Sequence, residues 1–132
     1  TKNGAMGAEV VVVLNPELRG PILNARKQAT QLMSKLRFIA AQVDALLTDD
    51  RWRVHAEHAN AMAARLAAGV GETVYPVEAN AVFAVLPQDR IHELAERHTF
   101  YIWEPARNVA RLMTAWDTPS EAVDALIADI AR

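Results

Sequence analysis

The sequence predicts an α/β chain that ends in a small α+β domain. Apolar residues recur at helical spacing between residues 24 and 70, which is the pattern of amphipathic helices. Short runs rich in β-branched and aromatic residues follow from residue 73, and an amphipathic helix closes the chain. We therefore expect linking helices followed by a ββαββα domain with a largely antiparallel sheet and its helices on one face.

Length and composition favour one ordinary hydrophobic core. The chain has 132 residues, of which 52% are hydrophobic, and a formal net charge of -2. This balance argues against a nucleic-acid partner, which normally requires a basic face, and against binding to anionic membranes. The chain contains no cysteine, so it can form neither a disulfide framework nor a thiolate metal site. No apolar run is long enough to span a bilayer.

The N-terminal part contains one expected strand. Residues 8–14 are apolar apart from Glu9 and lie between Gly7 and Asn15, which predicts a strand that is buried on both faces. Residues 15–24 contain two prolines and one glycine, so we expect a connection with about one helical turn.

A long amphipathic helix is expected over residues 24–48, with a break near Ser34. Its basic residues lie in its N-terminal half, where a solvated face and phosphate binding are both compatible with the pattern. These residues are Arg26, Lys27, Lys35 and Arg37.

A second helix is expected from residue 51 to residue 68, because Asp49 or Asp50 can cap it and a glycine follows its end. Its two histidines, His55 and His58, are three residues apart and could share a ligand. Without a third ligand, such a pair is more often a surface or packing feature than a metal site. We therefore predict no metal.

The remaining residues, 72–132, predict the small domain. Its closing helix should begin at a capping box, Thr118-Pro119-Ser120-Glu121. We expect strands at residues 73–77, 81–86, 100–103 and 109–116, and helices at residues 88–98 and after Thr118.

Arg111 lies inside the apolar strand expected at residues 109–116. An arginine there is costly to bury unless its guanidinium meets an anion or carbonyl groups. A solvent-facing or edge position would also explain it. From the residues alone, both interpretations stay open.

Lys2 precedes the expected first strand and is followed by two glycines, Gly4 and Gly7. Glycines allow tight turns and a close approach to a ligand. A lysine that is desolvated beside a buried strand has a lowered pKa and can form a Schiff base. A solvated lysine beside a flexible turn is the simpler alternative.

The opening string Thr1-Lys2-Asn3-Gly4-Ala5-Met6-Gly7-Ala8-Glu9, followed by a valine run, resembles low-specificity L-threonine aldolases. Further segments resemble this family in the same order and at similar spacing, so the resemblance covers essentially the whole chain. They are Arg26-Lys27, Ser34–Phe38, His58–Ala63, Tyr75–Asn80 and Arg111–Thr118.

The resemblance implies roles for three residues. Lys2 would be the catalytic lysine that binds pyridoxal 5'-phosphate as a Schiff base. Arg37 would reach the cofactor phosphate of a neighbouring subunit, and Arg111 would bind the α-carboxylate of the amino-acid substrate. A guanidinium suits both anions.

The resemblance also implies the organisation of the chain. Residues 1–23 would be a remnant of the large cofactor-binding domain, residues 24–71 would be linking helices, and residues 72–132 would be the small C-terminal domain of a fold-type-I enzyme. The strand at residues 8–14 would belong to the sheet of the large domain, so in this chain it would pair with another copy or lie displaced. The rest of the cofactor site would precede Thr1, so we expect this portion to be inactive alone and to lack the cofactor. The intact parent would be a cytoplasmic homo-oligomer, a dimer or tetramer, that cleaves L-threonine and L-allo-threonine-like β-hydroxy amino acids to glycine and an aldehyde.

Two alternatives remain from the sequence. Another fold-type-I enzyme with the same cofactor would catalyse β-elimination or racemisation instead of aldol cleavage. A non-enzymatic ββαββα interaction module would need no cofactor, and Lys2 would then be a tail residue.

Overall fold

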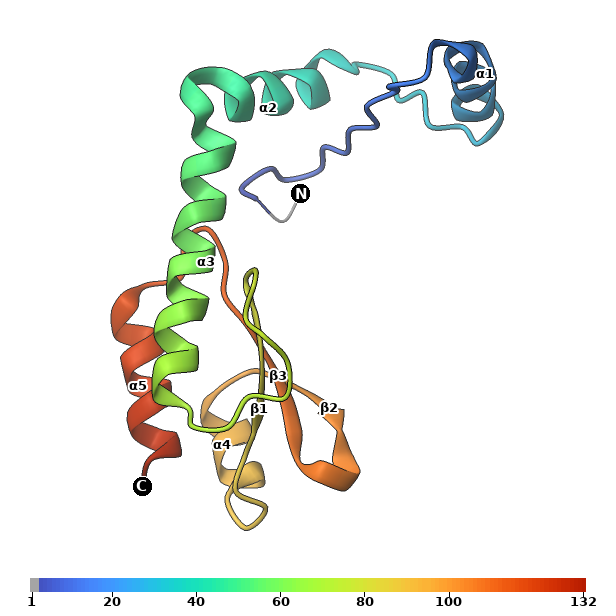
Figure 1. The fold of residues 1–132 in the computed structure, drawn as a ribbon. Coiled ribbons are helices and arrows are strands. Elements are labelled where there is room, and N and C mark those ends of the chain that lie inside the picture. Colours follow the sequence, from blue (N-terminus) through green and yellow to red (C-terminus); the bar gives the residue numbers. More distant parts are fainter. Residues whose placement is uncertain (1–2) are drawn as a thin grey trace. The chain divides into compact units, whose positions relative to one another are not determined.

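The computed structural model describes residues 3–132, so Lys2 lies outside the described residues. The chain divides into two compact units, Thr1–Trp52 and Arg53–Arg132. Its elements are drawn in Figure 1. In chain order they are η1 (Pro16–Leu18), α1 (Arg19–Gln28), α2 (Arg37–Leu47), η2 (Thr48–Asp50), α3 (Arg51–Gly69), β1 (Ala81–Val85), α4 (Ile91–Arg97), β2 (Tyr101–Glu104), η3 (Pro105–Arg107), β3 (Val109–Met113) and α5 (Ser120–Ile130).

The first unit has little buried surface. Neither α1 nor α2 has a buried residue, and only Ala8 is buried among the residues that the structure describes in this unit. The strand expected at residues 8–14 is not formed, and Val11 and Val12 are exposed. The prediction of a buried strand is wrong, because a strand requires a hydrogen-bonded neighbour and the described part of this unit contains no other strand. A displaced segment, the alternative expected where neighbouring strands are lacking, agrees with the structure.

The helix expected over residues 24–48 is broken, as predicted, and Ser34 lies between α1 and α2. Thr30 has a left-handed backbone (φ 55°). The N–H of Thr30 donates to the Lys27 carbonyl at 3.2 Å and the N–H of Gln31 to the Arg26 carbonyl at 3.0 Å. These bonds terminate α1 in a Schellman motif, with threonine where glycine is usual.

The start of that helix was predicted too late. η1 and the first part of α1 occupy most of residues 15–24, which we expected to be a connection. Pro21 is compatible with this helix because it lies in the first turn, where the missing N–H has no intrahelical partner in any case.

The second unit is built on a three-stranded sheet with the order β1-β3-β2. Both pairings are antiparallel, and β3 is the central strand. Helices α3, α4 and α5 all pack against one face of this sheet, because their buried residues share one core with the inward-facing residues of β1 and β3. Figure 1 shows α3 beside α5. The core residues are Ala63, Leu66, Val70, Val82, Ala84, Leu86, Leu94, Ala110, Leu112 and Val123.

The first of the four expected strands, residues 73–77, is absent. Thr73 forms only an isolated bridge with Ala84, and the Val74 N–H donates to the Phe83 carbonyl at 2.8 Å. Pairing stops there because Pro76 has no N–H to donate. The domain is therefore βαββα rather than ββαββα.

The capping box predicted for the last helix is also wrong. The Thr118 hydroxyl oxygen accepts from the Ala115 N–H at 2.7 Å, so it is already used in the preceding turn. Pro119 is the N-cap residue of α5, without a side-chain cap bond. The helix itself is confirmed.

Candidate functional site

Arg111 lies on β3, on the face of the sheet that points away from the helices. Its neighbours Ala110 and Leu112 are buried in the core, and side chains alternate between faces along a strand. Its cross-strand partners are Phe83 on β1 and Tyr101 on β2, so these side chains share the outer face. Arg111 is half-buried.

Among residues 3–132, the Arg111 guanidinium forms no hydrogen bond and no ion pair. It therefore has no anionic partner in this part of the chain. None of its nitrogen atoms is buried without a partner. The aliphatic stem is therefore partly covered, while the charged end reaches solvent. Such a guanidinium is available to bind a carboxylate through paired N–H donors.

Three aromatic residues form a connected group on this outer face. We call Tyr75, Phe83 and Trp103 the aromatic shelf. The Phe83 ring meets the Tyr75 ring edge-on at a centroid distance of 5.2 Å and the Trp103 ring edge-on at 5.2 Å. Edge-to-face pairs at this distance are favourable. The shelf therefore fixes the aromatic neighbour of Arg111 from two sides.

Trp103 lies at an irregularity in β2. Ile102 pairs with Ala110 and Glu104 pairs with Val109, so two steps along β2 match one step along β3. Trp103 is the extra residue of a β-bulge, a feature that re-aims side chains. Its ring contacts a residue of β1 although β3 lies between, and Val109 beneath this span is 0% exposed.

Arg37 is the first residue of α2 and is exposed. Its guanidinium carbon lies 4.8 Å from the centroid of the Phe38 ring. A cation at the N-terminus of a helix adds to the positive end of the helix dipole, which is unfavourable unless an anion binds there. Lys35, with a left-handed backbone (φ 63°), adds a second positive charge close by in sequence. This arrangement is suited to a phosphate group.

The residues that follow Lys2 are held within the first unit. The Asn3 side-chain amide donates to the Trp52 carbonyl at 2.7 Å. The N–H groups of Met6 and Gly7 both donate to Gln42 Oε1, at 2.9 and 3.1 Å. Gly4 has φ 102°, a conformation that favours glycine. The loop that follows Lys2 is therefore anchored to α2 and to the start of α3.

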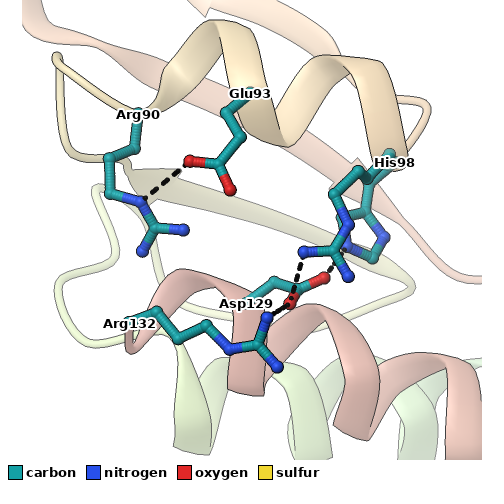
Figure 2. Close-up of polar contacts among 6 residues, drawn as sticks. Arg90, Glu93, His98, Asp129 and Arg132 are labelled. Carbon is teal, nitrogen blue, oxygen red and sulfur yellow. Dashed lines mark hydrogen bonds and ion pairs between the residues drawn. The ribbon is translucent and has the colours of Figure 1, made fainter.

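The most connected polar group of the second unit was not predicted. Asp129 on α5 is 3% exposed. It accepts a hydrogen bond from His98 Nε2 at 2.7 Å and ion-pairs with Arg97 at 2.9 Å and Arg132 at 3.2 Å. Figure 2 shows His98 and Arg132 converging on the Asp129 carboxylate. It also shows Arg90, the residue before α4, paired with Glu93 on α4, and the Nε–Oε2 distance of this pair is 3.5 Å.

These contacts affect the Asp129 carboxyl. The hydrogen bond from His98 lowers its pKa, burial opposes this, and the charges of Arg97 and Arg132 lower it further. The net shift is downward. The cluster joins the end of α4 to the end of α5, so its role is to hold these helices together. The sequence signal is an acidic residue three positions after Leu126, in the apolar stripe of the closing helix.

The two histidines of α3 have separate surroundings. His58 Nε2 lies 2.8 Å from the Thr118 carbonyl oxygen, to which it donates. The His55 ring lies 4.9 Å from the Trp116 ring. Within residues 3–132, no group of three possible metal ligands is present, and no helix is long and apolar enough to cross a membrane.

Comparisons with known proteins bear on these residues. No protein-family model matches the sequence. The chain is 38% identical over 135 residues to the low specificity L-threonine aldolase of Pseudomonas aeruginosa, covering 98% of this chain and 39% of that protein. It is 36% identical to the enzyme of the same name from a Pseudomonas sp., with the same coverage of 98% and 39%.

A solved structure of Leishmania major threonine aldolase matches 91% of this chain and 37% of its own, with a TM-score of 0.84 and 28% identity. The match is to a C-terminal portion of that structure. The chain thus spans about two-fifths of the length of its curated relatives (39%). The resemblance to low-specificity L-threonine aldolases and the mixed helix-strand fold class are confirmed.

Proposed function

We propose that this chain, which is similar throughout to low-specificity L-threonine aldolases, is the C-terminal portion of a pyridoxal-phosphate-dependent aldolase. This parent enzyme would cleave L-threonine and L-allo-threonine-like β-hydroxy amino acids to glycine and an aldehyde. The observation that carries the proposal is Arg111, a half-buried arginine on the sheet. Among residues 3–132 it lacks an anionic partner, in a chain whose relatives are named for an amino-acid substrate.

Arg111 would bind the α-carboxylate of the substrate. Two parallel N–H donors fix the plane of a carboxylate as well as its position. With the carboxylate fixed, rotation about the bond to Cα is limited, and the Cα–Cβ bond can be held in the orientation needed for cleavage. Placement on the central strand of the sheet gives the arginine a rigid backbone.

Two residues of the first unit would hold the cofactor. Arg37, exposed at the N-terminus of α2, fits a phosphate for the electrostatic reason given above. Lys2 would bind the cofactor covalently through Nζ. When bound, pyridoxal 5'-phosphate would supply the electron sink that accepts the electron pair of the breaking Cα–Cβ bond.

We also propose that the parent enzyme is a cytoplasmic homo-oligomer, a dimer or tetramer, in which Arg37 contacts the phosphate of a neighbouring subunit. The exposed apolar surface of the first unit supports association. Neither α1 nor α2 has a buried residue, although Leu23, Phe38 and Leu47 on these helices are large and apolar. Such surfaces commonly mark interfaces.

The direct test is an assay of the parent enzyme with added cofactor and L-threonine. We expect release of glycine and acetaldehyde, and we expect Lys2→Ala to abolish it, because no neighbouring side chain supplies an amine. Lys27→Ala is the matched control, since Lys27 is a lysine of the same unit on α1.

Three results would contradict parts of this proposal. Normal turnover in Lys2→Ala would remove the role of Lys2. Release of pyruvate and ammonia in place of glycine would indicate a β-eliminating lyase. If borohydride reduction of the parent with the cofactor labels no lysine, an interaction module becomes the better interpretation.

A further inference from the structure

We propose that the aromatic shelf is a positioning device for Arg111, which holds the arginine stem so that the guanidinium stays ready for a carboxylate. Phe83 is the central positioning residue, and Trp103 braces it from β2. This inference rests on the proposed carboxylate-binding role of Arg111. It concerns the second unit alone.

The register of the sheet gives the first step. Phe83 is the direct cross-strand partner of Arg111 on one side and Tyr101 is its partner on the other. Directly opposed side chains on one face of an antiparallel pair are close enough to interact. The stem of Arg111 therefore lies in a row between two aromatic residues, which explains why it is half-buried on a face that the helices do not cover.

The second step concerns what keeps this row in place. Phe83 is held by edge contacts with Tyr75 and Trp103, each at a centroid distance of 5.2 Å. Tyr101 lies opposite Arg111 on the outer face and Ile102 packs against the core, so strand alternation places Trp103 on the outer face with Phe83. The bulge between Ile102 and Glu104 adds one residue to β2 at this point.

The third step is energetic. An arginine side chain has large rotamer freedom, which is lost when it binds a ligand. Rigid aromatic neighbours remove part of that freedom before the ligand arrives, which improves affinity without a new contact to the ligand. They also offer no carboxylate, so the guanidinium is not held in an internal ion pair. The aromatic shelf thus restricts the rotamers of Arg111 without occupying its hydrogen-bond donors.

The test uses the 132-residue chain and nuclear magnetic resonance of arginine side chains. The Nε–Hε signal of Arg111 is assigned by its loss in Arg111→Lys. We expect a high heteronuclear NOE in the wild type and a clearly lower one in Phe83→Leu and Trp103→Leu. Phe83→Tyr should keep the high NOE of the wild type, because the aromatic ring is retained.

Val82→Ala is the control for a purely structural effect. Val82 is the neighbour of Phe83 on β1 but is 0% exposed in the core, so its truncation should lower stability while leaving the Arg111 signal rigid. An unchanged NOE in Phe83→Leu, or an equal loss in Val82→Ala, would overturn the inference.

Kinetics of the parent enzyme separate this inference from the proposed function. We expect Phe83→Leu to raise KM for L-threonine about threefold with kcat nearly unchanged, since only part of the arginine rotamer entropy is restored. If Arg111→Lys leaves KM unchanged, the carboxylate role itself fails. If Arg111→Lys raises KM and Phe83→Leu does not, only the role of the shelf fails.

Discussion

Gly69 ends α3 at a place where a side chain does not fit. A Cβ atom built there would lie 2.6 Å from both Cδ1 and Cγ2 of Ile127 on α5, and 2.8 Å from its Cγ1. Real contacts are not this short, so Gly69→Ala requires Ile127 or the two helices to move. Cγ1 and Cγ2 are bonded to the Cβ of Ile127, so rotation of the side-chain end alone cannot relieve the clash.

We expect Gly69→Ala to change the free energy of unfolding in the opposite direction to most glycine-to-alanine substitutions in helices. Replacing a glycine in a helix by alanine normally stabilises it by up to about 1 kcal/mol. Overpacking a core contact costs about 1–3 kcal/mol. We therefore expect Gly69→Ala to lower the free energy of unfolding by about 1–2 kcal/mol, with the propensity gain offsetting part of the clash.

Urea unfolding followed by far-UV circular dichroism measures this change. Gly20→Ala is the matched control, because Gly20 is also helical, in α1, and has no atom within 4 Å of the built Cβ. It should be neutral or stabilising. In an Ile127→Ala background, Gly69→Ala should no longer destabilise. A Gly69→Ala chain that is more stable than the wild type would refute this account of the α3–α5 contact.

Three further predictions concern charge and activity. In the parent enzyme, Arg111→Leu should raise KM for L-threonine at least about tenfold, the scale of a charge-assisted hydrogen bond, while the absorbance of the bound cofactor stays unchanged; an unchanged KM would count against the carboxylate role. The pKa of Asp129 is lowered in the folded chain, so its stabilising effect is present above its unfolded pKa and is lost as the pH falls through the folded value. Acid unfolding below about pH 4 should thus be steeper for the wild type than for Asp129→Asn, and identical pH profiles would contradict this. The isolated 132-residue chain should bind pyridoxal 5'-phosphate weakly and cleave no threonine; saturable binding with turnover would show that its site is complete.

The elements predicted correctly are those whose signals are local. The helix of residues 51–68 was predicted from the aspartates that precede it and the glycine that follows it, and it corresponds to α3 (Arg51–Gly69). The strand at residues 81–86 corresponds to β1 (Ala81–Val85), which alternates between half-buried and buried residues. The strand at residues 8–14 was wrong for a non-local reason. Its valines have strong β-propensity, but propensity does not supply a hydrogen-bonded partner.

The residues of the candidate site also divide into those with a local sequence signal and those without one. Arg111 stood out in the sequence because a charge inside an apolar strand is conspicuous. The aromatic shelf could not be predicted, because it depends on the order and register of three strands. Asp129 was missed because its partners Arg97 and His98 lie more than thirty residues away (31 for His98). Spacing along one helix does not reveal a partner on another.

The strand order has a consequence for how the domain is made. Among the strands that the structure describes, β1 and β2 each pair with β3, although β3 is the last of the three in the sequence. A short connection joins β2 to β3. In contrast, β1 is separated from its partner strand, which begins at Val109, by α4 and β2. A nascent chain that ends before Val109 therefore contains β1 and β2 without the strand that joins them, and β1 has only the isolated bridge to Thr73. Because loop closure precedes any gain from pairing, formation of the sheet begins only when its central strand has been synthesised.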